Sequence, residues 1–431
     1  MPFRTMNIAM ISYHTCPLAV LGGKHTGGMN VYVRELTRSL GPLDVHVDVF
    51  TRSENEHVPH VIHELGYGNR VVHVPAGPEV PLPKAELPRY LPEFSEGVLR
   101  FAAEKGLHYD LVHAHYWLSG LAGSELKTRW NVPLVTMFHT LALLKNRVLL
   151  DPADREPAER VEGERRVVAS SERIVAATRP EAGALVKLYG AEPERVEVIP
   201  PGVDVSRFYP IQADEAKAAV DLPAGKGVIL FVGRIEPLKG VETLLRAFEL
   251  LERSGLLADF PHVLAIIGGD TGSEDGEPDA EMARLQQLAD QLGIHHLVMF
   301  MGKRGQETLP YYYSAAEMVV VPSHYESFGM VALEAMACGT PVIATRVGGL
   351  ARLVQNGRTG FVVPDSDPRM LAEAIERLIR DPALRARIGQ EGTHYAQRFA
   401  WEKISRRVLK LYDRVLAERL VAGPVARPGA R

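Results

Sequence analysis

The amino-acid sequence predicts an α/β protein built from two doubly wound, Rossmann-like domains. The chain has 431 residues, which is more than one hydrophobic core usually sustains. Short apolar runs alternate with helical patterns, as is typical of a parallel sheet covered on both faces. This alternation occurs in two separate sets, so two such domains are expected.

The first set of apolar runs lies in the N-terminal half. A helix is expected from about Asn30 to Leu40, because Val33, Leu36 and Leu40 recur at helical spacing. The expected strands of this set are MNIAMIS, VHVDVF, VVHV, DLVHAH, VPLVTMF and RIVAAT.

The second set is separated from the first by VEVIPPGVDVSRFYP. Paired prolines and a glycine break regular structure, so this segment is expected to be a hinge without a strand or helix. The expected strands of the second set are GVILFVG, HVLAIIGG, LVMFMG, MVVVPS, PVIATR and GFVVP.

The C-terminal part reads mainly as helix after Asp367. Its last helix carries an apolar stripe and is expected to cross back to the first domain. The two domains are expected to face each other across a cleft. We expect a first domain over residues 1–205, a second over 206–400, the crossing helix over 401–420 and a frayed tail over 421–431. The stripe consists of Trp401, Ile404, Val408 and Leu411.

Composition and charge narrow the class of protein. Hydrophobic residues make up 46%, charged residues 24%, and the net charge is -4, which argues against a nucleic-acid partner. No run approaches the roughly 20 apolar residues that span a bilayer, so no membrane insertion is expected. Cys16 and Cys338 lie far apart, which excludes a disulfide framework and a cysteine zinc site and favours a cytoplasmic location.

Glycines follow the first strand of the first set, and cations follow the first strand of the second set. Open parallel sheets bind ligands at these strand ends. Gly27 and Gly28 would let the backbone approach an anion at the start of the next helix, although a flexible loop is the alternative. Arg234 and Lys239 flank a proline-containing turn and can converge on one diphosphate. The alternative is a pair of solvated loop cations.

Two acidic residues stand out in SHYESFGMVALEAMACGTPVIAT. A helical rise of about 1.5 Å per residue would place Glu326 and Glu334 up to roughly 12 Å apart. An unsatisfied acid in the apolar surroundings of Glu334 costs several kcal/mol, so ligand hydroxyls or a backbone donor should satisfy it. Alternatively, Glu334 belongs to the polar stripe of a half-exposed helix.

Together, these glycines, cations and acids resemble the large retaining GT-B glycosyltransferase family that includes sucrose-phosphate synthases. The resemblance covers nearly the whole chain. It implies a GT-B fold and a metal-independent enzyme that needs no cofactor and uses a nucleotide sugar as donor. It also implies donor contacts: Glu326 to sugar hydroxyls, Glu334 to the ribose, Arg234 and Lys239 to the diphosphate, and the backbone of Phe328, Gly329 and Met330 to the same sugar and phosphate.

Four segments, HTGGMN, YDLVHAHYWLSG, FHTLALLKN and ATRVGG, are similar to the D-inositol 3-phosphate glycosyltransferases of the mycothiol pathway. Those enzymes transfer N-acetylglucosamine from UDP to inositol phosphate. The segments GKHTGG and ALLKNR depart from that pattern and leave the acceptor open. The similarity implies that Lys84, Tyr116, Thr140 and Arg160 hold the acceptor phosphate, that Asn30 contacts the inositol ring, that His139 lies by the donor sugar, and that Arg304 lies near the uracil.

Several of these residues have ordinary structural alternatives. Arg160 lies in the charge-rich stretch EPAERVEGERRVV, which is typical of a solvated helix face. His113 and His115 alternate along a strand, so one of them is expected to be a core histidine. Asp365 and Asp367 form an Asp-x-Asp pair that is interpreted as a helix-capping turn and not as a metal site.

Other functions remain open at this stage. A sucrose-phosphate synthase-like enzyme would use a sugar phosphate as acceptor, and a UDP-sugar 2-epimerase would need no acceptor. A dinucleotide-dependent dehydrogenase is disfavoured, because no G-x-G-x-x-G follows the first strand of either set. The donor sugar, glucose or N-acetylglucosamine, and a possible homodimer are also left open.

Overall fold

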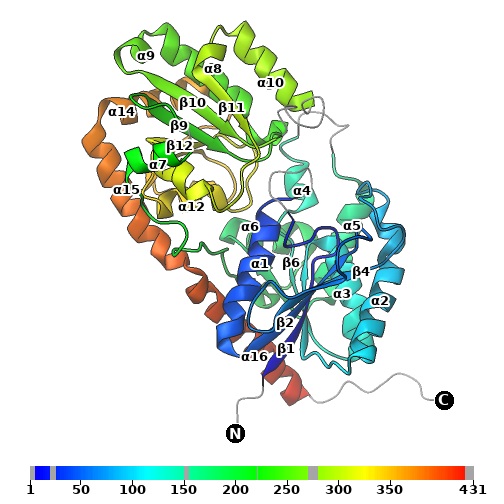
Figure 1. Ribbon diagram of the computed structural model, residues 1–431. Helices are drawn as coiled ribbons and strands as arrows, with labels where there is room; N and C mark the ends of the chain where they lie inside the picture. The colour runs from blue at the N-terminus through cyan, green and yellow to red at the C-terminus, as the bar shows by residue number, and fades with distance from the viewer. Residues whose placement is uncertain (1–4, 20–25, 150–154, 221, 270–279, 423–431) are drawn as a thin grey trace, which may run out of the picture. The chain divides into compact units, whose positions relative to one another are not determined.

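A computed structural model describes residues 5–19, 26–149, 155–220, 222–269 and 280–422. The chain divides into two compact units, each with a mainly parallel sheet between helices (Figure 1). This architecture confirms the predicted α/β class. The first unit comprises Met1–Ala19, Met29–Pro200 and Trp401–Arg431, and the second comprises Val20–Gly28 and Pro201–Ala400.

The sheet of the first unit has the strand order β3-β4-β2-β1-β5-β6-β7-β8. All neighbouring strands pair in parallel except β3 and β4, which are antiparallel. Each of the six predicted runs forms a strand. The strands are β1 Met6–Ile11, β2 Val45–Arg52, β3 Val61–Ile62, β4 Arg70–Val74, β5 Leu111–His115, β6 Leu134–Met137, β7 Arg173–Ala176 and β8 Val196–Val198.

The expected hinge was wrong at its beginning, because Val196–Val198 forms strand β8. This short segment precedes the prolines and pairs in parallel with β7 at the edge of the sheet. An edge position needs hydrogen bonds on one side only, so three extended residues are enough to join the sheet. The paired prolines at 200 and 201 then end the strand.

The helices of the first unit begin at recognisable local signals. At the start of α6, the hydroxyl of Thr178 accepts from Glu181 N, and Glu181 Oε2 accepts from Ala177 N at 2.7 Å. These two bonds satisfy helix-end donors reciprocally, as in a capping box. The helices are α1 Gly28–Leu40, α2 Leu91–Glu104, α3 Trp117–Trp130, α4 Ala142–Lys145, α5 Ala158–Ser170, α6 Arg179–Tyr189 and α16 Trp401–Ala422.

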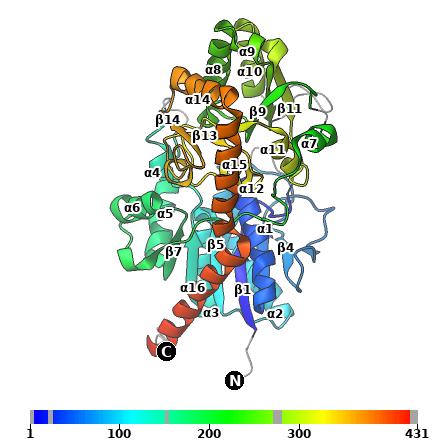
Figure 2. The same cartoon turned by 90° about the vertical axis from the view of Figure 1, so that its left-hand side faces the viewer.

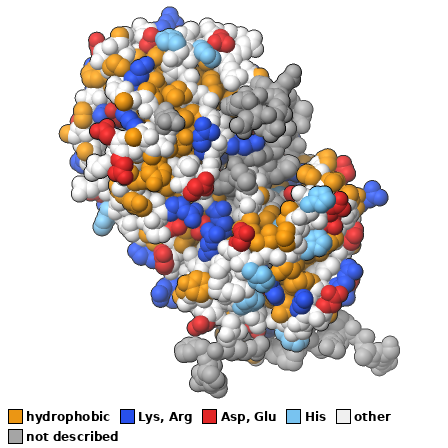
Figure 3. Space-filling view, in the orientation of Figure 1, with side chains coloured by type: hydrophobic (Ala, Val, Ile, Leu, Met, Phe, Trp, Pro, Cys, Tyr) orange, Lys and Arg blue, Asp and Glu red, His pale blue; other side chains and the backbone are white. Residues whose placement is uncertain are grey.

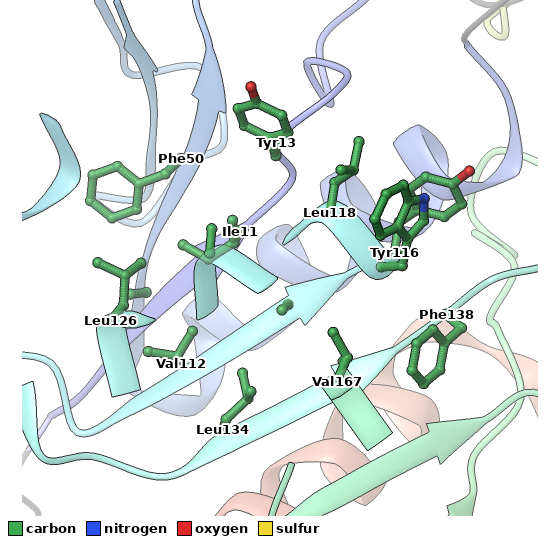
Figure 4. Packing of buried hydrophobic residues seen from close by; sticks show 14 of the residues in the cluster. Ile11, Tyr13, Phe50, Val112, Tyr116, Leu118, Leu126, Leu134, Phe138 and Val167 are labelled. Carbon is green, nitrogen blue, oxygen red and sulfur yellow. The ribbon is translucent and has the colours of Figure 1, made fainter. Parts of the chain in front are cut away.

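One hydrophobic core of the first unit lies between the sheet and helices α2, α3 and α5. Figure 4 shows Val112 and Leu134, from neighbouring strands, packed beneath Leu126 of α3. A Cβ on Gly120 of α3 would come within 2.5 Å of Val167 Cγ1, so glycine is needed where α3 and α5 cross. This close packing fixes α5, which carries Arg160.

Helix α16 packs on the first unit through the predicted apolar stripe. All four residues of the stripe are buried, and Figure 2 shows the red helix running across this unit. Tyr412 adds a polar anchor, because its hydroxyl lies 2.6 Å from Nδ1 of His113 on β5. The tail was expected over 421–431, but α16 continues to Ala422, and residues 423–431 lie outside the described residues.

The second unit contains a fully parallel sheet in the order β11-β10-β9-β12-β13-β14. Its strands are β9 Gly227–Val232, β10 His262–Ile267, β11 Val298–Gly302, β12 Met318–Val321, β13 Val342–Thr345 and β14 Gly360–Val363. Its helices are α7 Ala213–Ala219, α8 Val241–Arg253, α9 Leu256–Asp259, α10 Ala280–Gln291, α11 Leu309–Ala315, α12 Met330–Ala337, α13 Leu350–Leu353, α14 Pro368–Arg380 and α15 Pro382–Ala396. All six predicted strands are present.

Two surface properties bear on possible partners. Acidic and basic side chains are both spread over the face of each unit that Figure 3 shows, consistent with the small net charge. In the described part of the chain, every helix is too short or too polar to cross a bilayer.

Candidate functional site

The strand order reverses between β9 and β12 in the second unit. From β9, the chain adds β10 and β11 on one side, and β12, β13 and β14 follow on the other. The loops at such a switch point diverge above the sheet and leave room for a ligand at the carboxyl ends of the strands. The predicted donor residues lie largely in the loops that follow these two strands.

Lys239 and Glu326 meet at this switch point. Lys239 ends the 3₁₀ turn Pro237–Lys239 after β9, and its Nζ lies 2.7 Å from Oε2 of Glu326, in the loop after β12. The loops touch through their backbones, because a Cβ on Gly240 would lie 2.0 Å from the carbonyl oxygen of Pro322. The side chains are 19% and 18% exposed, so the pair is accessible to a ligand.

Arg234 has a different carboxylate partner. Its Nη2 lies 2.9 Å from Oε1 of Glu236, and both side chains are about one-third exposed. Gly27 and Gly28 group with this second unit. A Cβ on Gly27 would lie 3.8 Å from Arg234 Nε, and one on Gly28 would lie 3.3 Å from Met330 Sδ.

A pair of glycines that sequence reasoning did not assign to the site supports the Glu326 loop. Gly349 N donates to the carbonyl oxygen of Glu326 at 3.0 Å. A Cβ on Gly348 would lie 1.9 Å from that oxygen, and one on Gly349 would lie 2.5 Å from Phe328 Cα. These glycines end the motif ATRVGG and come just after β13, the strand next to β12. Their position at this edge of the sheet could have indicated their role from the sequence.

Glu334 lies inside the second unit and not on a half-exposed face. It is 7% exposed on α12, and Tyr313 of α11 donates its hydroxyl to Oε2 at 2.8 Å. The expected satisfying group was a ligand or a backbone donor, so this tyrosine was missed. The helical spacing estimate was also wrong, because α12 begins at Met330 and Glu326 precedes it.

The remaining sequence-predicted residues of the second unit lie elsewhere on it. Arg304 follows edge strand β11, with β10 between that strand and β9, and its Nε donates to Tyr312 Oη at 2.9 Å. Asp367 caps α14 by accepting from the backbone of residues 369 and 370, as predicted. Asp365 lies 2.7 Å from Nδ1 of His324.

In the first unit, three of the four residues predicted to bind a phosphate come together. Tyr116 follows β5, Thr140 follows β6, and Arg160 lies on α5. Arg160 Nη2 donates to Thr140 O at 3.1 Å and to Oγ1 at 3.0 Å, and its Cζ lies 4.8 Å from the centre of the Tyr116 ring. Lys84 lies exposed on the segment between β4 and α2.

Arg160 is a buried residue, so the interpretation of its helix as a solvated face was wrong. Its side chain is 4% exposed and pairs with Glu156 through Nη1 at 3.0 Å and with Glu164 through Nε at 2.9 Å. Burial raises the pKa of Glu164, although Arg160 and the hydroxyl of Tyr189 oppose this effect. The i,i+4 spacing of Arg160 and Glu164 on α5 was a usable signal, whereas Glu156 lies just before the helix.

Three histidines cluster beside this network, of which His113 and His115 are fully buried and His139 is partly buried. His115 Nδ1 lies 3.0 Å from His139 Nε2, and the rings of His113 and His115 are 4.3 Å apart. Burial lowers the pKa of His113 and of His139 to about 3, so both rings are neutral near pH 7. His113 and His115 are both buried, although only one of them had been expected to be a core histidine.

Two residues at the strand ends have uncommon backbone conformations. His139 has φ of 62° and Tyr116 has φ of 79°. Such angles are strained for residues other than glycine, and this strain is often retained at functional sites. Asn30 is nearly fully buried on α1, where its Nδ2 donates to Thr15 Oγ1 at 2.7 Å.

Comparison with known proteins places these features in a family. Residues 26–207 match the Glycosyltransferase Family 4 model, and residues 212–395 match Glycosyl transferases group 1. D-inositol 3-phosphate glycosyltransferase from Acidothermus cellulolyticus is 44% identical over 425 residues, which are 98% of this chain and 93% of the relative.

Solved structures agree with this match. Sucrose-phosphate synthase from Thermosynechococcus elongatus is 36% identical with a TM-score of 0.86, over 96% of this chain and 100% of that one. Anabaena HepE, solved with UDP-glucose, is 20% identical with a TM-score of 0.71, over 95% and 100% of the two chains, and shows the shared fold alone. The chain belongs to the GT-B glycosyltransferase family.

Proposed function

We propose that this glycosyltransferase transfers a sugar from a UDP-sugar to inositol phosphate, with retention of anomeric configuration and without a metal or other cofactor. The observation that carries the proposal is the meeting of Tyr116, Thr140 and Arg160 in the first unit. A guanidinium beside two hydroxyl groups suits the oxygens of a phosphate. The relative from Acidothermus cellulolyticus is named for the same acceptor.

The proposed donor site is at the switch point of the second unit. Lys239 and Arg234 are accessible cations that would neutralise the diphosphate, while Glu326 would accept hydrogen bonds from sugar hydroxyls. Glu334 would bind the ribose and Arg304 would lie near the uracil. The Gly27–Gly28 turn and the backbone of Phe328, Gly329 and Met330 would contact the same sugar and phosphates.

The proposed reaction is a front-face displacement without a covalent intermediate. The bond from the anomeric carbon to the diphosphate oxygen breaks, and the acceptor hydroxyl oxygen bonds to the same face of that carbon. The hydroxyl proton passes to the leaving diphosphate. Glu326 is held by Lys239 at 2.7 Å, so we assign it to orienting the sugar and not to nucleophilic attack.

Metal independence rests on the available positive charge. Arg234 and Lys239 supply, at the diphosphate, the charge stabilisation that a divalent ion would otherwise give. Asp367, the second member of the Asp-x-Asp pair, is engaged in capping α14.

The proposed acceptor site includes residues around the Arg160 network. Lys84 would add a second cation to the phosphate, and Asn30 would contact the inositol ring. His139, which is neutral near pH 7, would hydrogen-bond the donor sugar. The homologous sucrose-phosphate synthase structure, at 36% identity, supports a second candidate in which a sugar phosphate is the acceptor.

An acceptor screen tests the proposal. The protein is incubated with UDP-N-acetylglucosamine or UDP-glucose and with inositol phosphate, fructose phosphate or no acceptor, and released UDP is measured. We expect rapid release only with inositol phosphate, an unchanged anomer in the product and full activity in EDTA. Preference for fructose phosphate would favour the second candidate, and donor conversion without acceptor would indicate an epimerase.

A further inference from the structure

The carboxylate of Glu156 bridges two cations in the first unit. Its Oε1 accepts from Lys145 Nζ at 2.7 Å, and its Oε2 lies 3.0 Å from Arg160 Nη1. Its backbone is held as well, because Glu156 N donates to Asn146 Oδ1 at 2.7 Å and Asn146 Nδ2 donates to Glu156 O at 3.3 Å. The Lys-Asn pair of FHTLALLKN therefore positions one carboxylate.

Counting donors shows that Arg160 is nearly saturated. A guanidinium has five N–H groups. The Nε group bonds to Glu164, Nη2 makes two contacts to Thr140, and Nη1 pairs with Glu156. A phosphate can therefore engage Arg160 through two N–H groups only if an existing partner leaves.

The local charges lead to the same conclusion. Lys145 and Arg160 carry two positive charges, and Glu156 and Glu164 carry up to two negative charges. Desolvation by burial on its own would raise the pKa of Glu156, but Arg160 and Lys145 together outweigh it, so the pKa is lowered. With both carboxylates ionised, the network offers no net positive charge to a phosphate.

We propose that Glu156 occupies the position of the acceptor phosphate, which must displace it from Lys145 and Arg160 in order to bind. This inference rests on the proposed function. A phosphate dianion can replace a carboxylate on two cations, whereas a neutral hydroxyl cannot. Glu156 thus sets the apparent affinity for a phosphorylated acceptor and leaves the affinity for an unphosphorylated one unchanged.

Glu156, and not Glu164, is the carboxylate that leaves. Glu164 is fully buried, and it accepts from Ala142 N at 3.1 Å and from the hydroxyl of Tyr189. Glu156 is 17% exposed at its side chain, so its carboxylate can reach solvent by side-chain rotation. Glu164 keeps Arg160 oriented while Glu156 exchanges.

Glu156→Gln tests the inference, because glutamine keeps the size and removes the charge. We expect the KM for inositol phosphate to fall about tenfold with little change in kcat, and the KM for inositol to be unaffected. Calorimetry with inorganic phosphate should show a matching gain in affinity. The matched control is Glu162→Gln on α5, which alters the net charge equally at an exposed position and should change neither the KM for inositol phosphate nor the affinity for phosphate.

A raised or unchanged KM for inositol phosphate in folded Glu156→Gln, or no gain in phosphate affinity, would overturn the proposal that the acceptor phosphate displaces Glu156. If Glu156→Gln is unstable, Asn146→Ala replaces it as the test. This variant loosens the backbone of Glu156 and keeps its charge, so it should lower the KM for inositol phosphate by a smaller factor. Equal use of inositol and inositol phosphate by the unmodified protein would instead refute the proposed function.

Discussion

The two units place cations at comparable edges of similar sheets but treat them differently. In the second unit, Lys239 and Arg234 each meet one carboxylate on a loop and stay partly exposed. In the first unit, Arg160 is buried between two carboxylates, a hydroxyl and an aromatic ring.

The difference separates two ways of preparing a charge for an anion. An exposed pair holds its cation loosely, so a ligand can take it over at small cost. A buried cation is oriented in advance, but its partners become part of the stability of the unit. Substitutions in the second unit should therefore reduce activity alone, whereas those in the first should also reduce stability.

Arg160→Ala should have the largest effect on stability. It leaves Glu164 buried without its charge partner, which typically costs about 3–5 kcal/mol. Urea denaturation measures this loss against Arg165→Ala, an exposed position on the same helix where about 0.5 kcal/mol or less is expected. Equal stability of the two variants would remove the contrast between the units.

Lys239→Ala should lower kcat by about 10²–10³, because the developing charge on the diphosphate loses a donor. Thermal unfolding should hardly change, since the Lys239–Glu326 pair is partly exposed. Lys226→Ala is the control. Lys226 is exposed and lies just before the amino end of β9, the strand that Lys239 follows. Near-normal turnover of Lys239→Ala would contradict the donor assignment.

Gly349→Ala tests the support of the second-unit loop. The added methyl group would lie 2.5 Å from Phe328 Cα, so the Glu326 loop must move. A displacement of about 1 Å can cost about 10²-fold in rate, and kcat/KM should fall by up to this factor. Gly183→Ala, where the methyl group meets open space, should leave activity unchanged.

The pH dependence of stability should be marked in the first unit. Burial lowers the pKa of His113 and His139 to about 3 and holds that of His115 well below its usual range. The unfolded chain therefore binds more protons below about pH 6.5, and the unfolding free energy falls as the pH is lowered toward 3.

Three carboxyls of the first unit whose pKa burial raises, those of Glu181, Glu164 and Glu54, work in the opposite direction. Burial raises the pKa of Glu181 to about 7, so its contribution falls as the pH rises from its unfolded value toward 7. The three histidines have the larger combined effect, and the net loss should appear on acidification. Between pH 6.5 and 5, His139→Gln should lose about 2 kcal/mol less than the unmodified protein, as urea unfolding would show. If the unfolding free energies of the two proteins changed equally between pH 6.5 and 5, this account would be contradicted.

The fold was largely readable because buried parallel strands give continuous apolar runs. All twelve predicted runs form strands, whereas the two-residue β3 and the three-residue β8 are too short to form a pattern. Polar residues after strand ends indicated Lys239 and Glu326, since parallel strands bring their carboxyl ends to one edge, whereas Tyr116 and Thr140 were implied by the family resemblance.

The partners of these residues were harder to predict. Tyr313, which satisfies Glu334, lies on another helix and gives no local signal. The charge-rich α5 resembled a solvated face, although tertiary packing buries Arg160 and Glu164. Burial of a charge depends on which elements cover it, and that information is not contained in one helix.

The ratio of kcat/KM for inositol phosphate to kcat/KM for inositol, with the same UDP-sugar, tests the central claim most directly. A site whose buried polar groups require the phosphate should give a ratio on the order of 10⁴. A ratio near one, or UDP release that does not depend on an acceptor, would contradict the assignment of Arg160 and its neighbours to the acceptor phosphate.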